Sequence, residues 1–334
     1  MDRMPVICDY GSGLSKVGFA GNEAPVAVFP TILGKLRHDT MLKGMEEKDW
    51  FMGDDAQKKR EEIILQYPIS RGAIHSWNNL EKIWHHSFYQ VLHIPPEEHP
   101  LMVTEPPLRT TIESGDGMTY FVPIMDGCPL HQSTFQLDVA GQDLTLYLLQ
   151  LLAERGNLLV GTADREYVRN VKEKCCYVAL DFDKEKVKAS DPPSCPQAFQ
   201  LPDGQEISLG QGAFVCPEAL FQTNFIGRNT LGIHMMASQC ITSCNPFLWK
   251  TLFSNIILSG GTGSFSGLRL RLQRELAGLV SPAIDVKVST SPYAQYGAWV
   301  GGSILASLST FKDMWVTSRE YKDVGGSIIN RRSF

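Results

Sequence analysis

Apolar and polar residues alternate in short runs at the start of the chain, and this pattern predicts a β-meander. The apolar runs cover residues 6–8, 16–21 and 26–30, and residues typical of turns separate them. Runs this short with a period near two favour strands over helices. The next residues, 31–53, are polar and irregular, so we expect a loop there.

Helical spacing of apolar residues occurs farther along the chain. Residues 78–91, 142–155 and 163–180 carry apolar side chains at intervals that place them on one face of a helix. A fourth stretch, 300–308, is apolar and rich in small residues, and it predicts a helix that packs closely on another element. The strand pattern restarts at Gln136, which indicates a second domain.

The composition places the chain among globular proteins. Its 334 residues are enough for two domains, with 43% hydrophobic residues, 20% charged residues and a net charge of −5. No basic run predicts nucleic-acid binding, and no apolar run approaches the ~20 residues that span a bilayer. The eight cysteines form no Cys-x-x-Cys pair, and we expect them to be reduced and buried. Without a secretory leader, the chain is expected in the cytoplasm with no membrane insertion.

Two glycine-rich turns beside acidic residues carry the candidate chemistry. The first spans residues 9–16, after an apolar strand, and the second spans 113–119. Glycine lets a backbone approach a ligand closely, and successive N–H groups in such a turn form an anion site. We expect the turns to face each other across a polyphosphate, with Asp9 and Asp116 holding Mg²⁺ through water. Either turn alone is more often an ordinary β-hairpin, so the prediction depends on the pair.

A third glycine turn follows the apolar run 256–258 and leads into a predicted helix over 266–276. A strand–turn–helix unit of this kind points a helix N-terminus at a bound nucleotide. The three turns together predict an ATP site built from two related halves.

Many stretches of the sequence resemble the actin family. They are GFAGNEAPVAVFPTILG, EKIWHHSFYQ, PEEHPLMVTEPPL, KEKCCYVALDF, CPEALFQ, NIILSGGT, WVGGSILASLSTFKDMWVTSREY and the terminal Arg-Arg-Ser-Phe. The resemblance runs from Val6 to Phe334 and is far more specific than a phosphate turn. The chain resembles a divergent actin or actin-related protein. This implies the α/β actin/sugar-kinase ATPase fold, with two α/β domains around a nucleotide cleft.

The resemblance also implies four subdomains. The first large subdomain would comprise residues 1–30, 68–109 and 297–334. The first small one would be 31–67, with a loop at 37–48 like the filament-contact loop of actins. The second large subdomain would comprise 110–140 and 229–296, and the second small one 141–228.

Individual site residues follow from the same resemblance. Those expected to contact ATP or ADP are Gly11, Ser12, Gly13, Leu14, Lys16, Gly115, Asp116, Gly117, Met118, Gly141, Arg169, Lys172, Glu173, Gly260, Gly261, Gly263, Ser264 and Phe265. Asp9 and Asp116 are expected to order the waters of Mg²⁺ or Ca²⁺. The cleft that receives partner proteins in actins is expected at Gly127, Leu305, Leu308 and Phe334.

Several residues depart from the actin pattern. They are Tyr10 for Asn, Arg71 for His, Glu113 for Asp, Tyr120 for His, Cys128 for Tyr, Gln295 for Lys and Ser333 for Cys. We expect the Tyr10 phenol to lie beside the phosphates. With Tyr120 in place of the His that helps order the attacking water, no catalytic set is expected to be intact.

The largest departure is a gap of about forty residues after Leu108, found by aligning the motifs. The chain passes directly through residues 109–112 into the second turn. The missing stretch would supply the Gln that positions the hydrolytic water, together with one strand and two helices of the first domain. We expect 101–104 to be a buried strand. The first domain, being incomplete, is expected to lose apolar contacts worth several kcal/mol.

Three functional hypotheses stay open. The first is an actin-like structural protein of the cytoskeleton that binds ATP and hydrolyses it poorly or not at all, with actin or actin-binding proteins as partners. The second is an ATP-hydrolysing protein of the actin type. The third is a shortened, non-functional product whose first domain does not fold. The resemblance implies a cytoplasmic, cytoskeletal or nuclear location and leaves polymerisation open.

Overall fold

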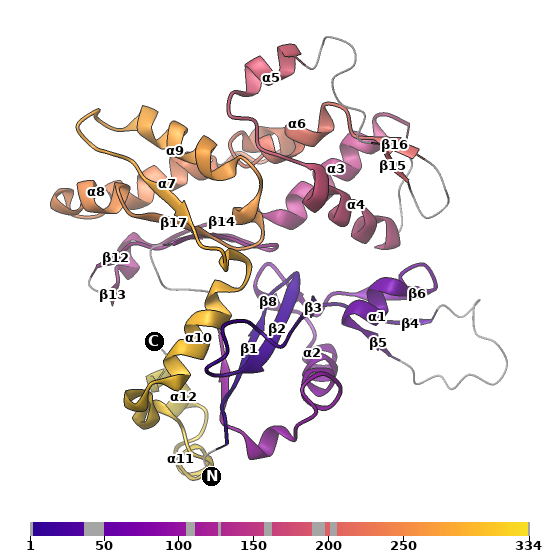
Figure 1. Cartoon of the computed structure of the whole chain (residues 1–334), viewed down its shortest axis with the longest axis vertical. Helices are drawn as coiled ribbons and strands as arrows, with labels where there is room; N and C mark the ends of the chain where they lie inside the picture. The colour runs from indigo at the N-terminus through magenta and orange to yellow at the C-terminus, as the bar shows by residue number, and fades with distance from the viewer. Residues whose placement is uncertain are drawn as a thin grey trace.

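The computed structural model describes residues 3–36, 50–104, 111–125, 128–156, 162–188, 198–200 and 206–332. Figure 1 shows two lobes, each with its own β-sheet and flanking helices. The first lobe contains the described residues up to Thr104 and the C-terminal helices from Gly297 onward. The second lobe contains the described residues between them. The α/β fold class predicted from the sequence is therefore confirmed.

The first lobe is built on a four-stranded sheet with the strand order β3-β2-β1-β9. Its strands are β1 (Val6–Tyr10), β2 (Leu14–Phe19), β3 (Ala27–Pro30) and β9 (Leu101–Val103). The first three form the antiparallel meander that the apolar pattern predicts, and β9 pairs with β1 in parallel. Val6, Cys8 and Val17 are fully buried in the core of this lobe.

The second lobe has a five-stranded sheet with the order β14-β11-β10-β17-β18. Its strands are β10 (Thr111–Ser114), β11 (Thr119–Phe121), β14 (Phe135–Leu137), β17 (Ile256–Ser259) and β18 (Val288–Thr290). The pairing directions repeat those of the first sheet, with two antiparallel pairs on one side and a parallel pair on the other. The second sheet adds β18, which pairs in parallel with β17. Among the described strands, none takes the corresponding place beside β9.

β9 is therefore an edge of the first sheet. Leu101 and Val103 are 43% and 46% exposed, although the sequence predicted a buried strand there. That prediction was wrong because a strand is buried on both sides only when a further strand and its covering helices flank it. No described strand pairs with the outer side of β9.

Helices complete the first lobe. The prediction of a helix over 78–91 is confirmed by α2 (Trp77–His85), which continues as a π-helical turn over His86–Val91. The last helices are α10 (Gly297–Ser307), α11 (Ser318–Val324) and α12 (Ser327–Arg332). Trp299 on α10 is fully buried and donates a hydrogen bond from Nε1 to the Ile7 carbonyl at 2.9 Å. This contact joins the C-terminal helices to the first strand.

A smaller sheet extends the first lobe sideways. It comprises β4 (Leu33–Leu36), β5 (Phe51–Met52) and β6 (Ile63–Gln66), with α1 (Gly53–Lys58) beside it. The prediction of a loop over 31–53 was wrong for β4 and β5, because Ile32 and Leu33 are buried in this unit and β5 pairs with β4. A two-stranded hairpin follows, formed by β7 (Ile69–Ser70) and β8 (Ala73–Ile74).

The second lobe is rich in helices. They are α3 (Gly141–Ala153), α4 (Thr162–Cys175), α5 (Phe182–Lys188), α6 (Gly212–Glu218), α7 (Ile233–Thr242), α8 (Pro246–Phe253) and α9 (Leu268–Leu279). The prediction over 142–155 is confirmed by α3. The prediction over 163–180 was wrong beyond Cys175, because the backbone N–H groups of Tyr177 and Val178 leave the helix pattern. They donate instead to the carbonyls of Ala213 and Ser266, at 3.0 and 2.8 Å.

Two further hairpins lie at the margins of this lobe, β12 (Ile124–Met125) with β13 (Cys128–Pro129) and β15 (Ala198–Gln200) with β16 (Glu206–Ser208). None of the described helices is both long and apolar enough to cross a membrane.

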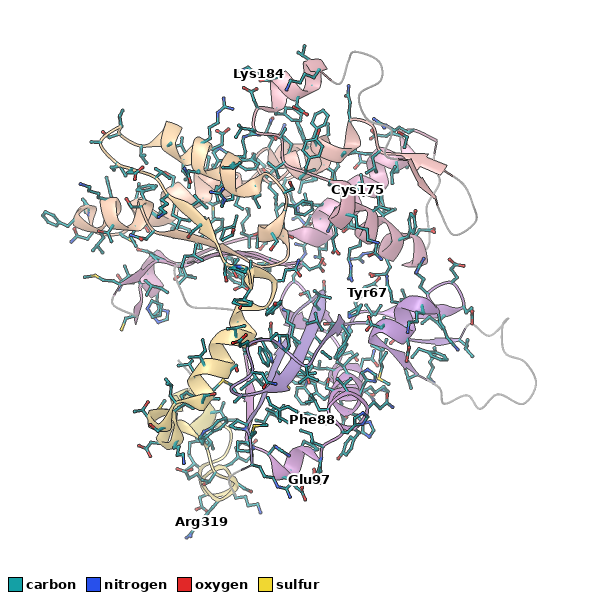
Figure 2. The ribbon with its side chains drawn as sticks, in the orientation of Figure 1. Tyr67, Phe88, Glu97, Cys175, Lys184 and Arg319 are labelled. Carbon is teal, nitrogen blue, oxygen red and sulfur yellow. The ribbon has the colours of Figure 1, made fainter. Side chains whose placement is uncertain are left out.

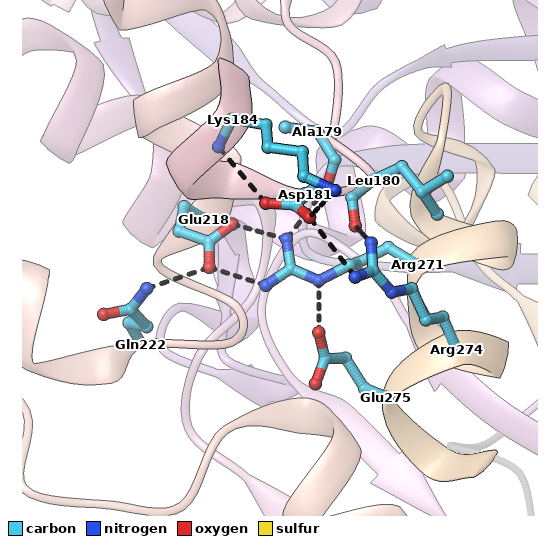
Figure 3. A network of polar contacts seen from close by, with 9 residues as sticks. All are labelled: Ala179, Leu180, Asp181, Lys184, Glu218, Gln222, Arg271, Arg274 and Glu275. Carbon is cyan, nitrogen blue, oxygen red and sulfur yellow. Dashed lines mark hydrogen bonds and ion pairs between the residues drawn. The ribbon is translucent and has the colours of Figure 1, made fainter. Parts of the chain in front are cut away.

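A buried polar network fastens α9 to the rest of the second lobe (Figure 3). The Arg271 guanidinium donates to both carboxylate oxygens of Glu218 at 3.0 Å and to the Ala179 carbonyl at 2.8 Å. Its Nε donates to Glu275 at 2.7 Å. Glu218 is fully buried, so the two-pronged ion pair satisfies a charge that would otherwise be costly.

Two crossings of the chain join the lobes, one between Thr104 and Thr111 and the other between Thr290 and Gly297. Side chains also meet across the boundary, and Figure 2 shows Tyr67 there. Its hydroxyl donates to Glu166 Oε1 on α4 at 2.9 Å. The Arg165 guanidinium lies 4.8 Å from the centroid of the Tyr67 ring, within the range of a cation–π contact.

Candidate functional site

A cavity of about 460 Å³ lies where the two lobes meet. Residues from all three glycine turns predicted from the sequence line it. Of the residues expected to contact a nucleotide, all border this cavity except Gly141 and Gly263. The structure thus brings together segments that are more than a hundred residues apart in the chain, as Ser12 and Ser264 illustrate.

The first turn joins β1 to β2, and Gly11 N–H closes it by donating to the Leu14 carbonyl at 3.0 Å. Asp9 lies at the end of β1 beside the cavity. Its Oδ2 accepts a hydrogen bond from Lys16 Nζ at 2.7 Å, and its Oδ1 accepts one from the Thr104 hydroxyl at 2.9 Å. These contacts fix one carboxylate and one ammonium group at the cavity wall.

Tyr10 borders the cavity, but its phenol packs in the core of the first lobe, so the prediction of a phenol beside the phosphates was wrong. Side chains alternate along a strand, and the Tyr10 ring turns away from Asp9 into the core of the first lobe. Its centroid lies 6.1 Å from that of Trp84. Burial, with a smaller effect of Cys8, raises the pKa of the Tyr10 hydroxyl far above its usual value.

The second turn joins β10 to β11 and faces the first at contact distance. Gly115 N–H closes it by donating to the Met118 carbonyl at 3.1 Å. A Cβ added at Gly117 would lie 2.6 Å from Ser12 Oγ, and one added at Gly13 would lie 2.8 Å from the Cβ of Asp116. Both distances are too short for a real side chain, so the glycines permit the close approach of the two turns.

The third turn follows β17 and backs against the second. Gly260 has φ of 88°, and a Cβ there would lie 2.2 Å from the Ser114 carbonyl oxygen. The Thr262 hydroxyl donates to the Gly115 carbonyl at 2.6 Å. The helix predicted over 266–276 is confirmed as α9, which begins at Leu268. The three turns therefore form one packed unit.

Lys172 borders the cavity and contacts Gly141, which lies behind the cavity wall. The Lys172 side chain is buried, and its Nζ donates to the Gly141 carbonyl at 2.7 Å and to Thr145 Oγ1 at 2.9 Å. Burial lowers the pKa of Lys172. Gly141 does not border the cavity, but its N–H donates to the Gly115 carbonyl at 3.1 Å. It supports the second turn from behind.

Arg169 and Glu173, from the same helix α4, border the cavity. Arg169 lies 3.3 Å from Glu166 and 3.7 Å from Glu173 between charged atoms. Gly263, the other expected residue outside the main cavity, borders a second, neighbouring hollow that shares Ser264 and Phe265 with it.

Sequence reasoning left several lining residues out of the expected site. They are Gly72, Thr104, Glu113, Tyr120, Lys174, Cys176, Thr262, Ser266, Gln295 and Ala298. Glu113, Tyr120 and Gln295 had a signal, since each departs from the actin pattern. No sequence signal marked Gly72 and Thr104, because their positions at the cavity depend on how the β7–β8 hairpin and β9 pack.

Glu113 is the most perturbed acid of the cavity. Burial raises its pKa to about 7, the Asp9 carboxylate adds to this rise, and the Lys16 ammonium opposes it. The pKa of the Tyr120 hydroxyl is also raised, first by burial and then by Glu113 and Asp138. The Tyr120 phenol is therefore neutral at neutral pH, whereas the Glu113 carboxyl titrates near neutral pH.

The acids of the cavity fit a hydrated divalent cation. Asp9, Glu113 and Asp116 all border it, and carboxylate oxygens are the ligands that Mg²⁺ and Ca²⁺ prefer. Among the described residues, no three His, Cys, Asp or Glu side chains are grouped closely enough to hold a metal directly.

The predicted partner cleft is described only in part. Leu305 lies half-buried on α10, and Leu308 follows that helix with 48% of its surface exposed. Gly127, Phe334 and the filament-type loop at 37–48 lie outside the described residues. The partner cleft stays a prediction.

Comparison with known families gives a decisive match. The family model for actin matches residues 2–113 and 109–334. The chain belongs to the actin family. The two matched segments of this actin-family chain meet at residues 109–113, where the sequence predicts the missing stretch.

Proposed function

We propose that this actin-family protein binds ATP or ADP with Mg²⁺ or Ca²⁺ in the cavity between its lobes. The observation that carries the proposal is the close approach of two glycine turns, each beside a carboxylate, at the wall of a cavity of about 460 Å³. In the proposed complex, Ser12, Gly13 and Lys16 hold the phosphates from one side and Gly117 from the other. Asp9 and Asp116 order the waters of the cation.

Calorimetry with MgATP on the full chain, paired with a thermal melt, tests this binding. Saturable binding and a melting temperature that rises with ligand support the proposal. Lys16→Met is expected to weaken binding, because it removes the ammonium beside Asp9. Lys58→Met, on an exposed pair with Asp55, is the matched control and is expected to bind as the unmodified chain does. Absence of binding by a cooperatively folded chain would contradict the proposal.

We propose further that the bound ATP is hydrolysed poorly or not at all. The support is chemical: Tyr120 borders the cavity in place of the His that orders water in actins, and burial raises the pKa of its hydroxyl. A neutral phenol is a weak general base at neutral pH. Phosphate release measured on the MgATP complex tests this, and a rate far above that of buffer would instead favour an ATP-hydrolysing protein of the actin type.

The proposed cellular role is structural, in the actin cytoskeleton of the cytoplasm, with actin or actin-binding proteins as partners. Family membership supports this role. The alternative is a location in the nucleus. Co-sedimentation with filamentous actin tests it, with a centrifuged sample lacking actin as control. No enrichment in the pellet or in any actin-containing complex would overturn it.

The alternative of a shortened, non-functional product is tested separately by limited proteolysis. If the first lobe folds, protection extends from about residue 5. If it does not, the protected fragment begins near residues 110–136, at the start of the second sheet.

A further inference from the structure

The turn that joins β7 to β8 touches both glycine turns of the site. Its two residues, Arg71 and Gly72, have φ of 49° and 71°. This left-handed conformation is ordinary for Gly and uncommon for Arg. A strained residue keeps such a conformation where its surroundings impose it, and the contacts of this turn supply that constraint.

The backbone of the β7–β8 turn bridges the two glycine turns. Gly72 N–H donates to Ser12 Oγ of the first turn at 3.0 Å. On the other side, a Cβ added at Gly117 would lie 2.8 Å from Arg71 Cα and 2.9 Å from Arg71 N. The β7–β8 turn therefore packs against both turns at once.

The Arg71 side chain reaches from the first lobe to the second. Its Nη2 donates to Asp143 Oδ1 at 2.7 Å, and its Nη1 donates to the Asp138 carbonyl at 3.1 Å. The Asp143 side chain is only 7% exposed, whereas that of Arg71 is 33% exposed. A charge-assisted contact with a nearly buried carboxylate is stronger than an ordinary surface pair.

Asp143 transmits this contact to the second glycine turn through the start of α3. Its Oδ2 accepts a hydrogen bond from Ala140 N–H at 3.1 Å, just before the helix. The next N–H groups, of Gly141 and Gln142, donate to the carbonyls of Gly115 and Asp116 at 3.1 and 2.9 Å. The carboxylate that Arg71 holds is thus fixed to the backbone that shapes the second turn.

We infer that Arg71 is a positioning residue that clasps the two lobes and keeps the phosphate-binding turns in register. Arg71 does not border the cavity, so it acts through the turns rather than on the ligand. The inference rests on the proposed nucleotide binding and adds a claim about its control. Loss of the clasp loosens the two turns and speeds nucleotide release.

The chain offers a matched control on the same carboxylate. Arg228 Nη2 lies 3.7 Å from Asp143 Oδ1. Arg228 and Asp143 both belong to the second lobe, so this contact does not connect the two lobes. In Arg71→Ala, the Asp143 carboxylate keeps Ala140 N–H and Arg228 as partners. That variant is therefore expected to fold, and Arg228→Ala removes a similar charge without opening the clasp.

Two measurements on the full chain test the inference. Without any ligand, hydrogen exchange is expected to rise in Arg71→Ala at the amides of Gly72 and Gln142, and to stay unchanged in Arg228→Ala. With a fluorescent ATP analogue and Mg²⁺, release from Arg71→Ala is expected to be about tenfold faster, the size of a typical coupling between sites. Asp143→Asn is expected to show the same two effects. The double variant with Arg71→Ala and Asp143→Asn is expected to change exchange and release little more than either single variant, because both substitutions remove the same contact.

The outcomes separate the clasp from the binding site. If the unmodified chain binds no nucleotide, the proposed function fails, and the exchange measurement without ligand still decides the clasp. If Arg71→Ala leaves both amides protected and release unchanged, the clasp is overturned. If Arg71→Ala does not fold, Arg71→Lys takes its place, since it keeps the charge and loses the planar fork. It is then expected to show smaller changes of the same sign, and unchanged exchange in it would also overturn the clasp.

Discussion

Gly13 of the first turn lies against Asp116 of the second so closely that an added Cβ would be 2.8 Å from the Asp116 Cβ. The two halves of the candidate site are therefore in contact. They can approach this closely because Gly13 has no side-chain methyl group. This close approach makes the site sensitive to the addition of even a small side chain at Gly13.

Gly13→Ala is expected to weaken MgATP binding about tenfold or more, because the new methyl group forces Asp116 or the turn itself to shift. Calorimetry measures the effect. Gly278→Ala on α9 is the control, since nothing lies within 4 Å of a Cβ there, and alanine favours a helix by about 1 kcal/mol over glycine. Equal loss of binding in both variants would contradict the steric explanation.

Glu113→Gln is expected to change the dependence of stability on pH in the absence of nucleotide and metal. The pKa of Glu113 is about 7 in the folded chain and 4.5 in its ordinary, unperturbed state, so the folded chain binds more protons between these pH values. Stability of the unmodified chain therefore falls as pH rises from about 4.5 to 7 and then levels off.

Thermal melts across this window check the pH prediction. Glu113→Gln is expected to be more stable than the unmodified chain at pH 8, and the advantage is expected to vanish near pH 4.5. Glu97→Gln, at an exposed position, serves as control and is expected to follow the unmodified chain. A constant difference at all pH values would mean that ionisation of Glu113 is not the cause.

Glu218→Ala is expected to cost about 3–5 kcal/mol, because it leaves the Arg271 guanidinium buried without its two-pronged partner. Glu275→Ala removes the other acid that contacts Arg271, but its side chain is 34% exposed, so a loss of about 1 kcal/mol or less is expected. Urea unfolding compares the two. Similar losses would show that burial does not distinguish these contacts.

Val103→Lys is expected to reduce concentration-dependent light scattering of the purified chain. Val103 is 46% exposed on the outer edge of β9, and exposed apolar edge strands promote association through free backbone groups. Ile304→Lys removes a 59% exposed apolar side chain from α10 and leaves the edge unchanged. If Ile304→Lys lowers scattering equally, general surface hydrophobicity is the cause and the strand edge is not.

Local patterns in the sequence predicted much of the fold. The meander over 6–30 and the helix over 142–155 depend on neighbours in the chain, and both are confirmed. The wrong predictions share a different origin. β9 is exposed because no described strand covers its outer side, and α4 ends at Cys175 because distant carbonyls take the next N–H groups.

The part of the candidate site formed by the glycine turns could be predicted from the sequence. The three glycine turns meet at one cavity as expected. The orientation of the Tyr10 phenol was missed, although the alternation of side chains along β1 contains that information. Gly72 was missed because its role depends on a hydrogen bond to Ser12, 60 residues earlier. Sequence spacing gives no sign of such a contact.

The two lobes are held together by covalent links and by side-chain contacts. Each lobe is a packed body with its own sheet, and the connections after Thr104 and after Thr290 are the covalent links between them. Side-chain contacts also span the lobes, and opening of the cavity has to break them. These contacts are the ion pair of Arg71 with Asp143 and the hydrogen bond from Tyr67 to Glu166.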